Sequence, residues 1–297
     1  MSEARRTTNH ERTGGPTVHD LVVTARGHLR AAGIPSDEAD LDARLLAEHV
    51  LGWTTERYFA DSTEPPPPSF DARFEALVAR RTAREPFAYI VGRQEFWGLE
   101  IAVSPAVLIP RPETELVVEA ARDAIAAESP AAVADVGTGS GCLAVAIARE
   151  RPRAAIVATD VSDAAIAIAR HNAETFGVAN RIVFHHTDLL DGVDDQFDLV
   201  VSNPPYVRDG DRSDIQPEVR FEPAGALYAG IDGLDVIRRL VPLSVERLTR
   251  GGTLIFEFGF GQADAVSELI SSVAGLRMVA LRRDLQNIPR VAIAQKQ

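Results

Sequence analysis

The chain of 297 residues holds a single cysteine, Cys142, so no intrachain disulfide can form. It also lacks an apolar run of the roughly 18 to 20 residues that cross a bilayer. Residues 1–15 do not contain the apolar centre of a secretory signal. Because unpaired thiols suit a reducing compartment, we expect a cytoplasmic protein that neither spans a membrane nor is exported. Residues 1–16 are polar and are expected to form a disordered tail.

Positive charge is also scarce, since the formal net charge is −12 at pH 7. A surface that wraps nucleic acid needs Lys and Arg to neutralise the phosphates. The acidic balance therefore argues against direct nucleic-acid binding, although a local basic patch is compatible with it. With 45% hydrophobic and 25% charged residues, the chain has the composition of a globular protein with a substantial core. Its length suits one large domain and one smaller domain.

The hydrophobic pattern divides the rest of the chain into three parts. In residues 17–85 apolar residues recur at helical spacing, which predicts a small all-α domain. Residues 86–112 contain two short extended pieces, 87–91 and 99–103, separated by glycines, which indicates a β-hairpin linker. In residues 113–297 strand-like and helix-like segments alternate, which is typical of an α/β fold with a mostly parallel sheet covered by helices on both faces.

Seven strands are expected in the large domain, in a Rossmann-like sheet. They are 132–136, 155–159, 182–185, 197–202, 253–258 and a final pair near Met278 and Val291.

A glycine-rich loop follows the first of these strands. Glycines after a strand allow a tight turn and let a ligand touch the backbone, while the helix that follows offers free N–H groups. The spacing G-x-G-x-G is one residue shorter than the dinucleotide fingerprint G-x-G-x-x-G. It therefore favours S-adenosylmethionine over a nicotinamide, with a structural turn or a different nucleotide as the alternatives. The loop consists of Gly137, Thr138, Gly139, Ser140 and Gly141.

Two acidic residues follow the next two strands. Asp160 ends the second strand about twenty residues after the glycines, where a carboxylate can accept both ribose hydroxyls. Asp188 follows the third strand, where a carboxylate could accept the adenine amino group. Each acid taken alone is more typical of a solvated strand end or a helix cap. Together at one edge of a parallel sheet, they predict a single crevice with the glycine loop.

A rigid loop, Asn203, Pro204, Pro205 and Tyr206, follows the fourth strand. Two successive prolines fix the backbone and remove two donors, so the neighbouring carbonyls face outward as acceptors. The Asn203 side-chain oxygen and the Pro204 carbonyl can each accept one hydrogen of an NH2 group, which leaves the nitrogen's electron density aimed at a sulfonium methyl. Tyr206 can stack on a planar acceptor group or exclude water.

This loop predicts methyl transfer to a conjugated NH2 nitrogen. Such nitrogens are poor nucleophiles because their lone pair is delocalised. Acceptors that tighten as positive charge develops stabilise the transition state, and fixed alignment supplies the rest without a strong base. The alternative is an ordinary Asn-Pro turn after a strand.

These residues resemble the HemK/PrmC family, the methyltransferases that modify the glutamine of the Gly-Gly-Gln motif in class 1 peptide chain release factors. The resemblance extends from about residue 84 to the end of the chain, whereas the N-terminal helices match only in character. Further similar segments are Glu95-Phe96-Trp97, Val103-Ser104-Pro105, Leu108 through Glu115, Arg220-Phe221-Glu222-Pro223 and Ile288-Pro289-Arg290-Val291.

The resemblance implies an S-adenosylmethionine-dependent protein-(glutamine-N5) methyltransferase, with its methyltransferase domain at 113–297 and a substrate-recognition domain at 17–85. Segment 109–115 would cover the cofactor, and no metal is expected. Residues 203–206 would hold the substrate glutamine. The implied cofactor contacts are Gly137 to Gly141, Asp160, Asp188, Leu189 and Asn203.

Two details of the resemblance leave alternatives open. Leu189 stands where some relatives carry an aromatic residue, so an apolar wall is kept without aromatic stacking on adenine. Arg220 and Glu222 fit a structural ion pair and a substrate contact equally well.

Three other functions compete with a release-factor substrate. A DNA adenine or cytosine amino-methyltransferase would use the same loop, but the acidic balance and the lack of a basic recognition domain argue against it. A ribosomal-protein glutamine methyltransferase differs only in features of the N-terminal helices and of segment 211–223. A non-enzymatic cofactor-binding scaffold would have no need of an intact acceptor loop. We expect a monomer that acts on a release factor and does not contact nucleic acid directly.

Overall fold

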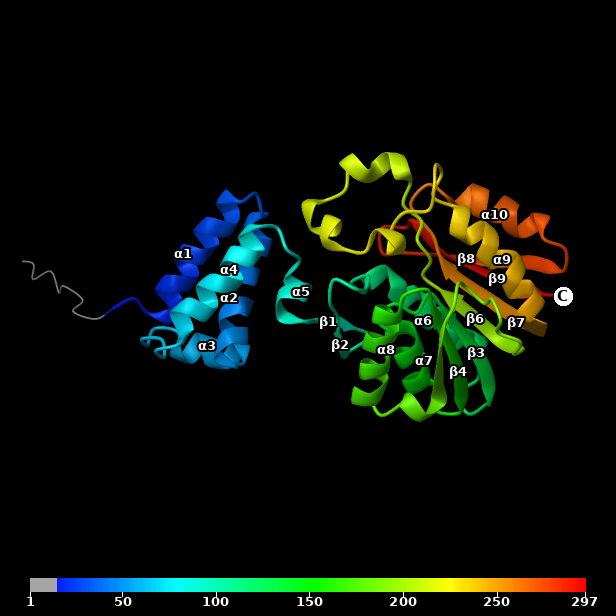
Figure 1. Cartoon of the computed structure of the whole chain (residues 1–297), viewed down its shortest axis with the longest axis horizontal. Helices are drawn as coiled ribbons and strands as arrows, with labels where there is room; N and C mark the ends of the chain where they lie inside the picture. Colours follow the sequence, from blue (N-terminus) through cyan, green and yellow to red (C-terminus); the bar gives the residue numbers. More distant parts are fainter. Residues whose placement is uncertain (1–14) are drawn as a thin grey trace, which may run out of the picture. The chain divides into compact units, whose positions relative to one another are not determined.

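A computed structural model describes residues 15–297 of the chain. The polar tail predicted at residues 1–16 falls mostly on residues 1–14, which lie outside this range. The chain divides into two compact units, the first ending at Val91 and the second beginning at Gly92 (Figure 1). This division cuts the linker predicted at 86–112, and residues 92–112 belong to the second unit. None of the helices within the described range combines the length and the apolar character that crossing a bilayer requires.

Between residues 15 and 91 all regular elements are helices. Their apolar stripes meet in one core that includes Leu29, Leu46 and Phe70. The elements are α1 (Val18–Ala31), α2 (Ser36–Leu51), α3 (Thr55–Asp61), α4 (Phe70–Thr82) and α5 (Phe87–Val91).

The extended piece predicted at 87–91 is wrong, because these residues form helix α5. The carbonyl of Pro86 accepts hydrogen bonds from the N–H groups of Tyr89 and Ile90 at 3.0 and 3.2 Å, which closes a helical turn. Ile90 is also buried in the core of the helical unit. Tertiary packing therefore outweighs the strand preference of this aromatic and β-branched segment.

The second unit begins with a hairpin, in which β1 (Arg93–Phe96) pairs antiparallel with β2 (Leu99–Ala102). Strand β2 corresponds to the piece predicted at 99–103, but its partner is 93–96 and not the predicted 87–91. The turn between them has φ of 55° at Trp97 and 69° at Gly98. Trp97 tolerates this left-handed conformation because its backbone N–H donates to Glu115 at 2.7 Å and its indole N–H donates to Glu150 at 2.9 Å.

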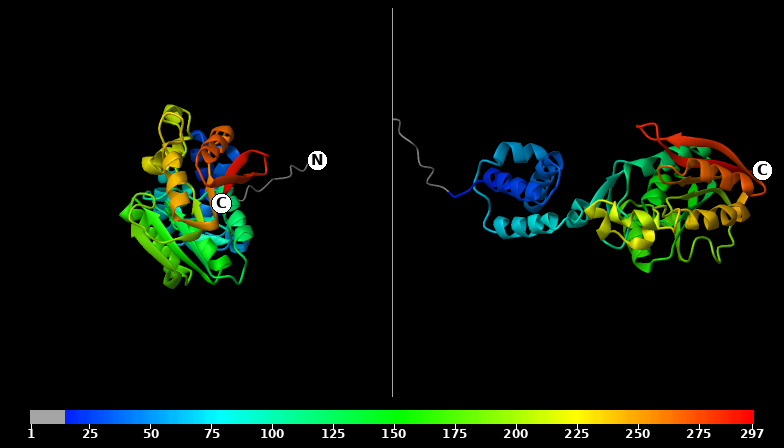
Figure 2. Two further views of the ribbon diagram at one scale, coloured as in Figure 1. Left: turned by 90° about the vertical axis from the view of Figure 1, so that its right-hand side faces the viewer. Right: turned by 90° about the horizontal axis from the view of Figure 1, so that it is seen from above.

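The large unit is built on a seven-stranded sheet with the order β5-β4-β3-β6-β7-β9-β8, which confirms the predicted fold class. Strand β9 runs antiparallel to the other six strands of this sheet, and Figure 2 shows the β8–β9 pair in orange and red at one edge of the sheet. The strands are β3 (Ala131–Val136), β4 (Ala154–Asp160), β5 (Ile182–His186), β6 (Phe197–Ser202), β7 (Leu248–Glu257), β8 (Leu276–Arg283) and β9 (Pro289–Lys296).

The strand order reverses at β3, which has β4 on one side and β6 on the other. Since βαβ crossovers are right-handed, this reversal puts α7 and α8 on one face of the sheet and α9 and α10 on the other. It also opens a crevice at the carboxyl ends of β3 and β6. The helices of this unit are α6 (Glu115–Ala124), α7 (Cys142–Glu150), α8 (Asp163–Thr175), α9 (Asp235–Arg247) and α10 (Ala263–Ser272).

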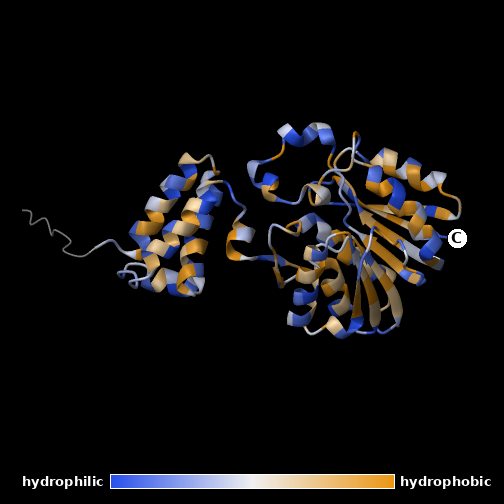
Figure 3. Ribbon diagram, in the orientation of Figure 1, coloured by the Kyte–Doolittle hydropathy of each residue, from blue (hydrophilic) through white to orange (hydrophobic). Residues whose placement is uncertain are grey.

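The core lies on both faces of the sheet, and hydrophobic residues follow its strands (Figure 3). Alternate residues of β3 and β6, including Ala134, Val136 and Val200, pack with Ile237 and Leu240 of α9. Burial on both faces explains why these strands are almost continuously apolar in sequence.

Candidate active site

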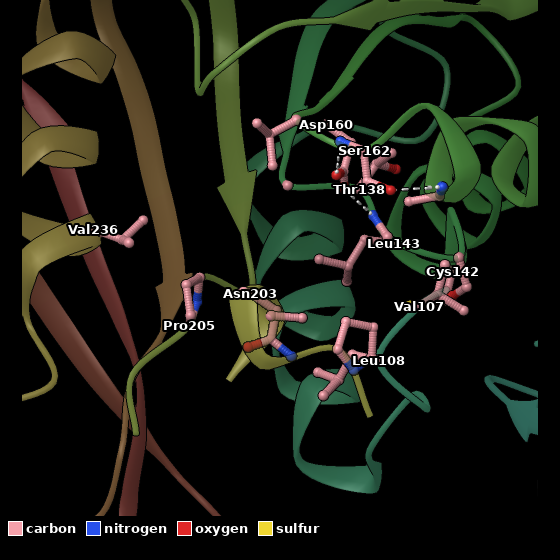
Figure 4. Close-up of a pocket in the computed structure, with 18 of the residues that line it drawn as sticks. Val107, Leu108, Thr138, Cys142, Leu143, Asp160, Ser162, Asn203, Pro205 and Val236 are labelled. Atoms are coloured by element: carbon pink, nitrogen blue, oxygen red, sulfur yellow. Dashed lines mark hydrogen bonds between the residues drawn. The ribbon is translucent and has the colours of Figure 1, made fainter. Parts of the chain in front are cut away.

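A pocket of about 250 Å³ lies at the carboxyl ends of β3, β4 and β6, where the strand order reverses (Figure 4). Gly141, Pro204 and Tyr206 were predicted site residues but do not line it in the described part of the chain. The predicted residues that do line it are Gly137, Thr138, Gly139, Ser140, Asp160, Asp188, Leu189, Asn203 and Pro205.

The three loop glycines have two different roles. Gly137, Gly139 and Gly141 have φ values of 72°, 55° and 79°, a region that only glycine adopts freely. A Cβ on Gly137 or Gly139 would meet open space, whereas one on Gly141 would come within 2.9 Å of the Cβ of Ala169 in α8. The first two glycines therefore leave room for a ligand, and the third allows close helix packing.

Asp160 fixes the glycine loop from the neighbouring strand. One of its carboxylate oxygens accepts the N–H of Gly139 at 2.8 Å, and the other accepts the N–H of Ser162 at 2.9 Å. Each carboxylate oxygen can accept more than one donor. Asp160 can therefore hold the loop and still accept hydroxyl groups from a ligand in the pocket that it lines.

A second acid, Asp135, supports the loop from beneath. It is fully buried and accepts the Thr138 hydroxyl at 2.6 Å and the N–H of Ala144 at 3.1 Å. Burial raises the pKa of Asp135 to about 7, and the two hydrogen bonds act in the opposite direction. The loop thus rests on a buried acid, one oxygen of which accepts both hydrogen bonds.

Asp188 and Leu189, which follow β5, also line the pocket. Asp188 accepts a hydrogen bond from Arg239 of α9 at 2.6 Å, and both side chains are about half exposed. The sequence could not reveal this ion pair, because Asp188 follows β5 whereas Arg239 lies in α9, 51 residues later. Leu189 has a φ of 52° and packs against the core beneath α9. A ligand beside these two residues would meet one apolar side chain and a paired carboxylate.

Asn203, at the end of β6, presents one unsatisfied atom. Its Nδ2 donates to the hydroxyl of Thr114 at 3.0 Å, whereas its Oδ1 is buried and has no hydrogen-bond partner among residues 15–297. Leaving a buried acceptor unpaired costs on the order of 1–3 kcal/mol. Figure 4 shows Asn203 near Pro205 and Leu108, across the pocket from Asp160 and Thr138. The arrangement suits a ligand that supplies a donor.

Tyr206 is held by partners outside the pocket. Its hydroxyl donates to Glu257 at 2.8 Å, and its carbonyl accepts from Gln262 at 3.0 Å. Burial raises the pKa of Tyr206 well above its ordinary value, and the carboxyl group of Glu257 adds to the rise. These contacts fix the end of the acceptor loop, and stacking of Tyr206 on a substrate stays a prediction.

The sequence interpretation missed Glu257, the last residue of β7. Its carboxylate accepts the Thr114 hydroxyl at 2.7 Å as well as the Tyr206 hydroxyl. Burial raises the pKa of Glu257, and the two hydrogen bonds lower it. A single acid between Phe256 and Phe258, directly after the apolar run 254–256, was the signal that could have revealed it.

Arg220 and Glu222 do not pair with each other, and each has a different partner. Glu222 is buried, pairs with Arg111 and accepts the N–H of Ile109 at 3.0 Å. Arg220 instead donates to the carbonyl of Ser213 at 3.4 Å. Glu222 thus ties the segment after the acceptor loop to segment 106–110, which contributes Leu108 and Pro110 to the pocket wall.

Comparisons with known proteins give a consistent result. Family models described as "PrmC N-terminal domain" and "Methyltransferase small domain" match residues 20–92 and 114–222. A release factor glutamine methyltransferase from Bordetella pertussis is 43% identical, covering 85% of this chain and 93% of its own. The protein of the same name from Cereibacter sphaeroides is 42% identical, covering 93% and 97%.

The fold also matches a solved structure, that of a 16S rRNA methyltransferase from T. thermophilus in complex with AdoMet and guanosine. It is 20% identical to this chain, with a TM-score of 0.50, and the match covers 69% of this chain and 50% of that one.

Proposed function

The chain belongs to the family of release factor glutamine methyltransferases, and on that premise we propose that it methylates the side-chain amide nitrogen N5 of the glutamine in the Gly-Gly-Gln motif of class 1 release factors. The methyl donor is S-adenosylmethionine. One observation carries the proposal at the level of chemistry, namely the buried, unpartnered Oδ1 of Asn203 beside the pocket. A primary amide offers the N–H group that this oxygen lacks.

Several groups of the pocket support S-adenosylmethionine as its ligand. Gly137 and Gly139 leave open space beside the backbone, and the positive end of the α7 dipole directly follows the loop. Asp160 is available for the ribose hydroxyls, while Asp188 and Leu189 would meet the adenine ring. When bound, the cofactor supplies a methyl group activated by its positively charged sulfur.

The acceptor loop would then orient the substrate amide. Asn203 Oδ1 accepts one N–H hydrogen, and the Pro204 carbonyl is the expected acceptor of the second. The nitrogen gains positive charge as its bond to the methyl carbon forms and the electron pair of the breaking carbon–sulfur bond moves to sulfur. Both hydrogen bonds strengthen at that point, which lowers the barrier. The methylated nitrogen is acidic while it carries this charge and loses a proton to solvent, so no side-chain base is needed.

Labelled methyl transfer tests this function. We expect the purified protein, supplied with S-adenosylmethionine labelled at the methyl group, to label an unmodified class 1 release factor. A release factor with alanine in place of the motif glutamine is the matched control and should stay unlabelled. Mass spectrometry of the tryptic peptide should locate one added methyl group on the glutamine. Label on DNA or on ribosomal proteins, with none on the release factor, would contradict the proposal.

We also propose that the chain acts in the cytoplasm, since its proposed substrate is a translation factor and its one cysteine is buried and unpaired. We further propose that it acts there as a monomer. Sedimentation at several protein concentrations tests the monomer, and a mass that rises with concentration would contradict it.

A further inference from the structure

The amide of Asn203 can be placed in two ways that differ by a half-turn. One presents its oxygen to the substrate, and the other presents its NH2 group. Only the first can accept a hydrogen of the substrate NH2. The second would bind the carbonyl oxygen of the substrate amide and turn its nitrogen away from the methyl group. Catalysis at nitrogen therefore needs a device that selects one orientation.

Hydrogen bonds from outside the loop supply this selection. The ionised Glu257 carboxylate is an acceptor only, and its two oxygens take the hydroxyl hydrogens of Thr114 and Tyr206 at 2.7 and 2.8 Å. A hydroxyl group has one hydrogen, so Thr114 has only lone pairs left. The Asn203 atom that lies 3.0 Å from this hydroxyl must then be a donor, Nδ2.

Resting on the proposed function, we propose that Glu257 is a positioning residue for methyl transfer, which acts through the Thr114 hydroxyl to hold the Asn203 amide with its oxygen toward the substrate. Glu257 itself is fully buried behind Thr114 and Tyr206 and does not line the pocket in the described part of the chain. Its role is to set the direction of the hydrogen-bond chain from β7 to the end of β6.

The hydrogen-bond chain depends on the ionisation of Glu257. A protonated carboxyl group is itself a donor, so it would reverse the Thr114 hydroxyl or displace that of Tyr206. Two charged side chains also act on Glu257: the negative charge of Glu113 raises its pKa, and the positive charge of Arg290 lowers it. Burial, the largest cause, keeps the pKa above the ordinary glutamate value. As pH falls, the protonated fraction therefore grows earlier than for an exposed glutamate, and turnover should fall with it.

Three variants test the positioning role. Thr114→Val keeps the shape of the side chain but removes the hydroxyl, and Thr114→Ser restores it. Glu257→Gln removes the charge and supplies an amide that can donate to Thr114. The matched control is Thr249→Val, because Thr249 donates to a carboxylate, Asp198, at 3.2 Å near the opposite end of the same strand. For each protein we would measure kcat and KM for release-factor methylation, S-adenosylmethionine affinity and the melting temperature.

We expect Thr114→Val to lower kcat at least about tenfold, the equivalent of one lost hydrogen bond in the transition state. Affinity for S-adenosylmethionine should change less than about threefold, while Thr114→Ser and Thr249→Val should stay near wild type. Glu257→Gln should reduce kcat several-fold and abolish the acidic fall in kcat that we expect of the wild type. This last measurement stands even if Thr114→Val folds poorly.

Two outcomes would overturn the positioning role while leaving the proposed function intact. One is a Thr114→Val enzyme with wild-type kcat. The other is an acidic limb of the kcat profile that is the same in Glu257→Gln and the wild type. If the wild type itself fails to methylate the release factor, the proposed function falls instead, so the two failures are distinguishable.

Discussion

The glycine loop at 137–141 and the acceptor loop at 203–206 face the same pocket but are held in different ways. Contacts of the glycine loop are short in sequence: Thr138 bonds to Asp135 three residues away, and Gly139 bonds to Asp160 21 residues away. Contacts of the acceptor loop are long. Asn203 bonds to Thr114 across 89 residues, and Thr114 bonds to Glu257 across 143.

This difference separates binding from turnover. Neighbouring strands and helices shape the glycine loop through backbone conformation, so changes there should act on cofactor affinity or stability. Side chains from β7 and from the segment before α6 orient the acceptor loop, so changes there should act on kcat while the cofactor still binds. Four substitutions test this separation.

The largest effect is expected for Asn203→Ala. Removing the oxygen that accepts the substrate N–H should lower kcat about 100-fold, as for the loss of one donor in an oxyanion hole. Calorimetry should show S-adenosylmethionine affinity within a few-fold of wild type. Equal losses in affinity and kcat would show that Asn203 serves the cofactor and would erase the distinction between the two loops.

Asp160→Ala should lower cofactor affinity rather than kcat. It removes the acceptor of the Gly139 N–H and the expected partner of the ribose hydroxyls. Loss of hydrogen bonds to a charged group costs about 1.5–3 kcal/mol, so S-adenosylmethionine affinity should fall roughly thirtyfold. At saturating cofactor, kcat should recover most of its wild-type value. A kcat that stays low at saturation would contradict the expectation.

Gly141→Ala should affect stability more than binding. The added Cβ would lie 2.9 Å from the Cβ of Ala169 and 3.0 Å from its Cα, in a backbone conformation with φ of 79°. Strain and overpacking should lower the free energy of unfolding by about 1–2 kcal/mol, measured by urea denaturation. Gly210→Ala is the control, since its φ is not positive and its Cβ would meet open space. Equal stability of the two variants would contradict the role of Gly141 in close helix packing.

The smallest effect is expected for Arg239→Gln. This change breaks the half-exposed ion pair with Asp188, and such pairs contribute about 0–1 kcal/mol. S-adenosylmethionine affinity should change less than about threefold, and the difference should shrink as salt is added. A tenfold loss would mean that Arg239 contacts the ligand directly.

Much of this protein was determined by its sequence alone. Alternation of apolar segments predicted the seven-stranded sheet, and the expected strand at 197–202 matches β6 residue for residue. Glycine spacing and the acids after strands predicted which residues would meet at one edge. These features depend on local periodicity and on the rule that parallel strands end together, so they can be read without coordinates.

Only the tertiary structure decided which side chains pair. In the folded protein residues 87–91 form a helix, and Glu222 pairs with Arg111 rather than with Arg220. Glu257 accepts a hydrogen bond from Thr114. The sequence shows that each of these groups can donate or accept, but not which groups are close. Hydrogen bonds act over about 3 Å, so their partners depend on how distant segments pack, and the orientation of Asn203 is a property of the folded sheet.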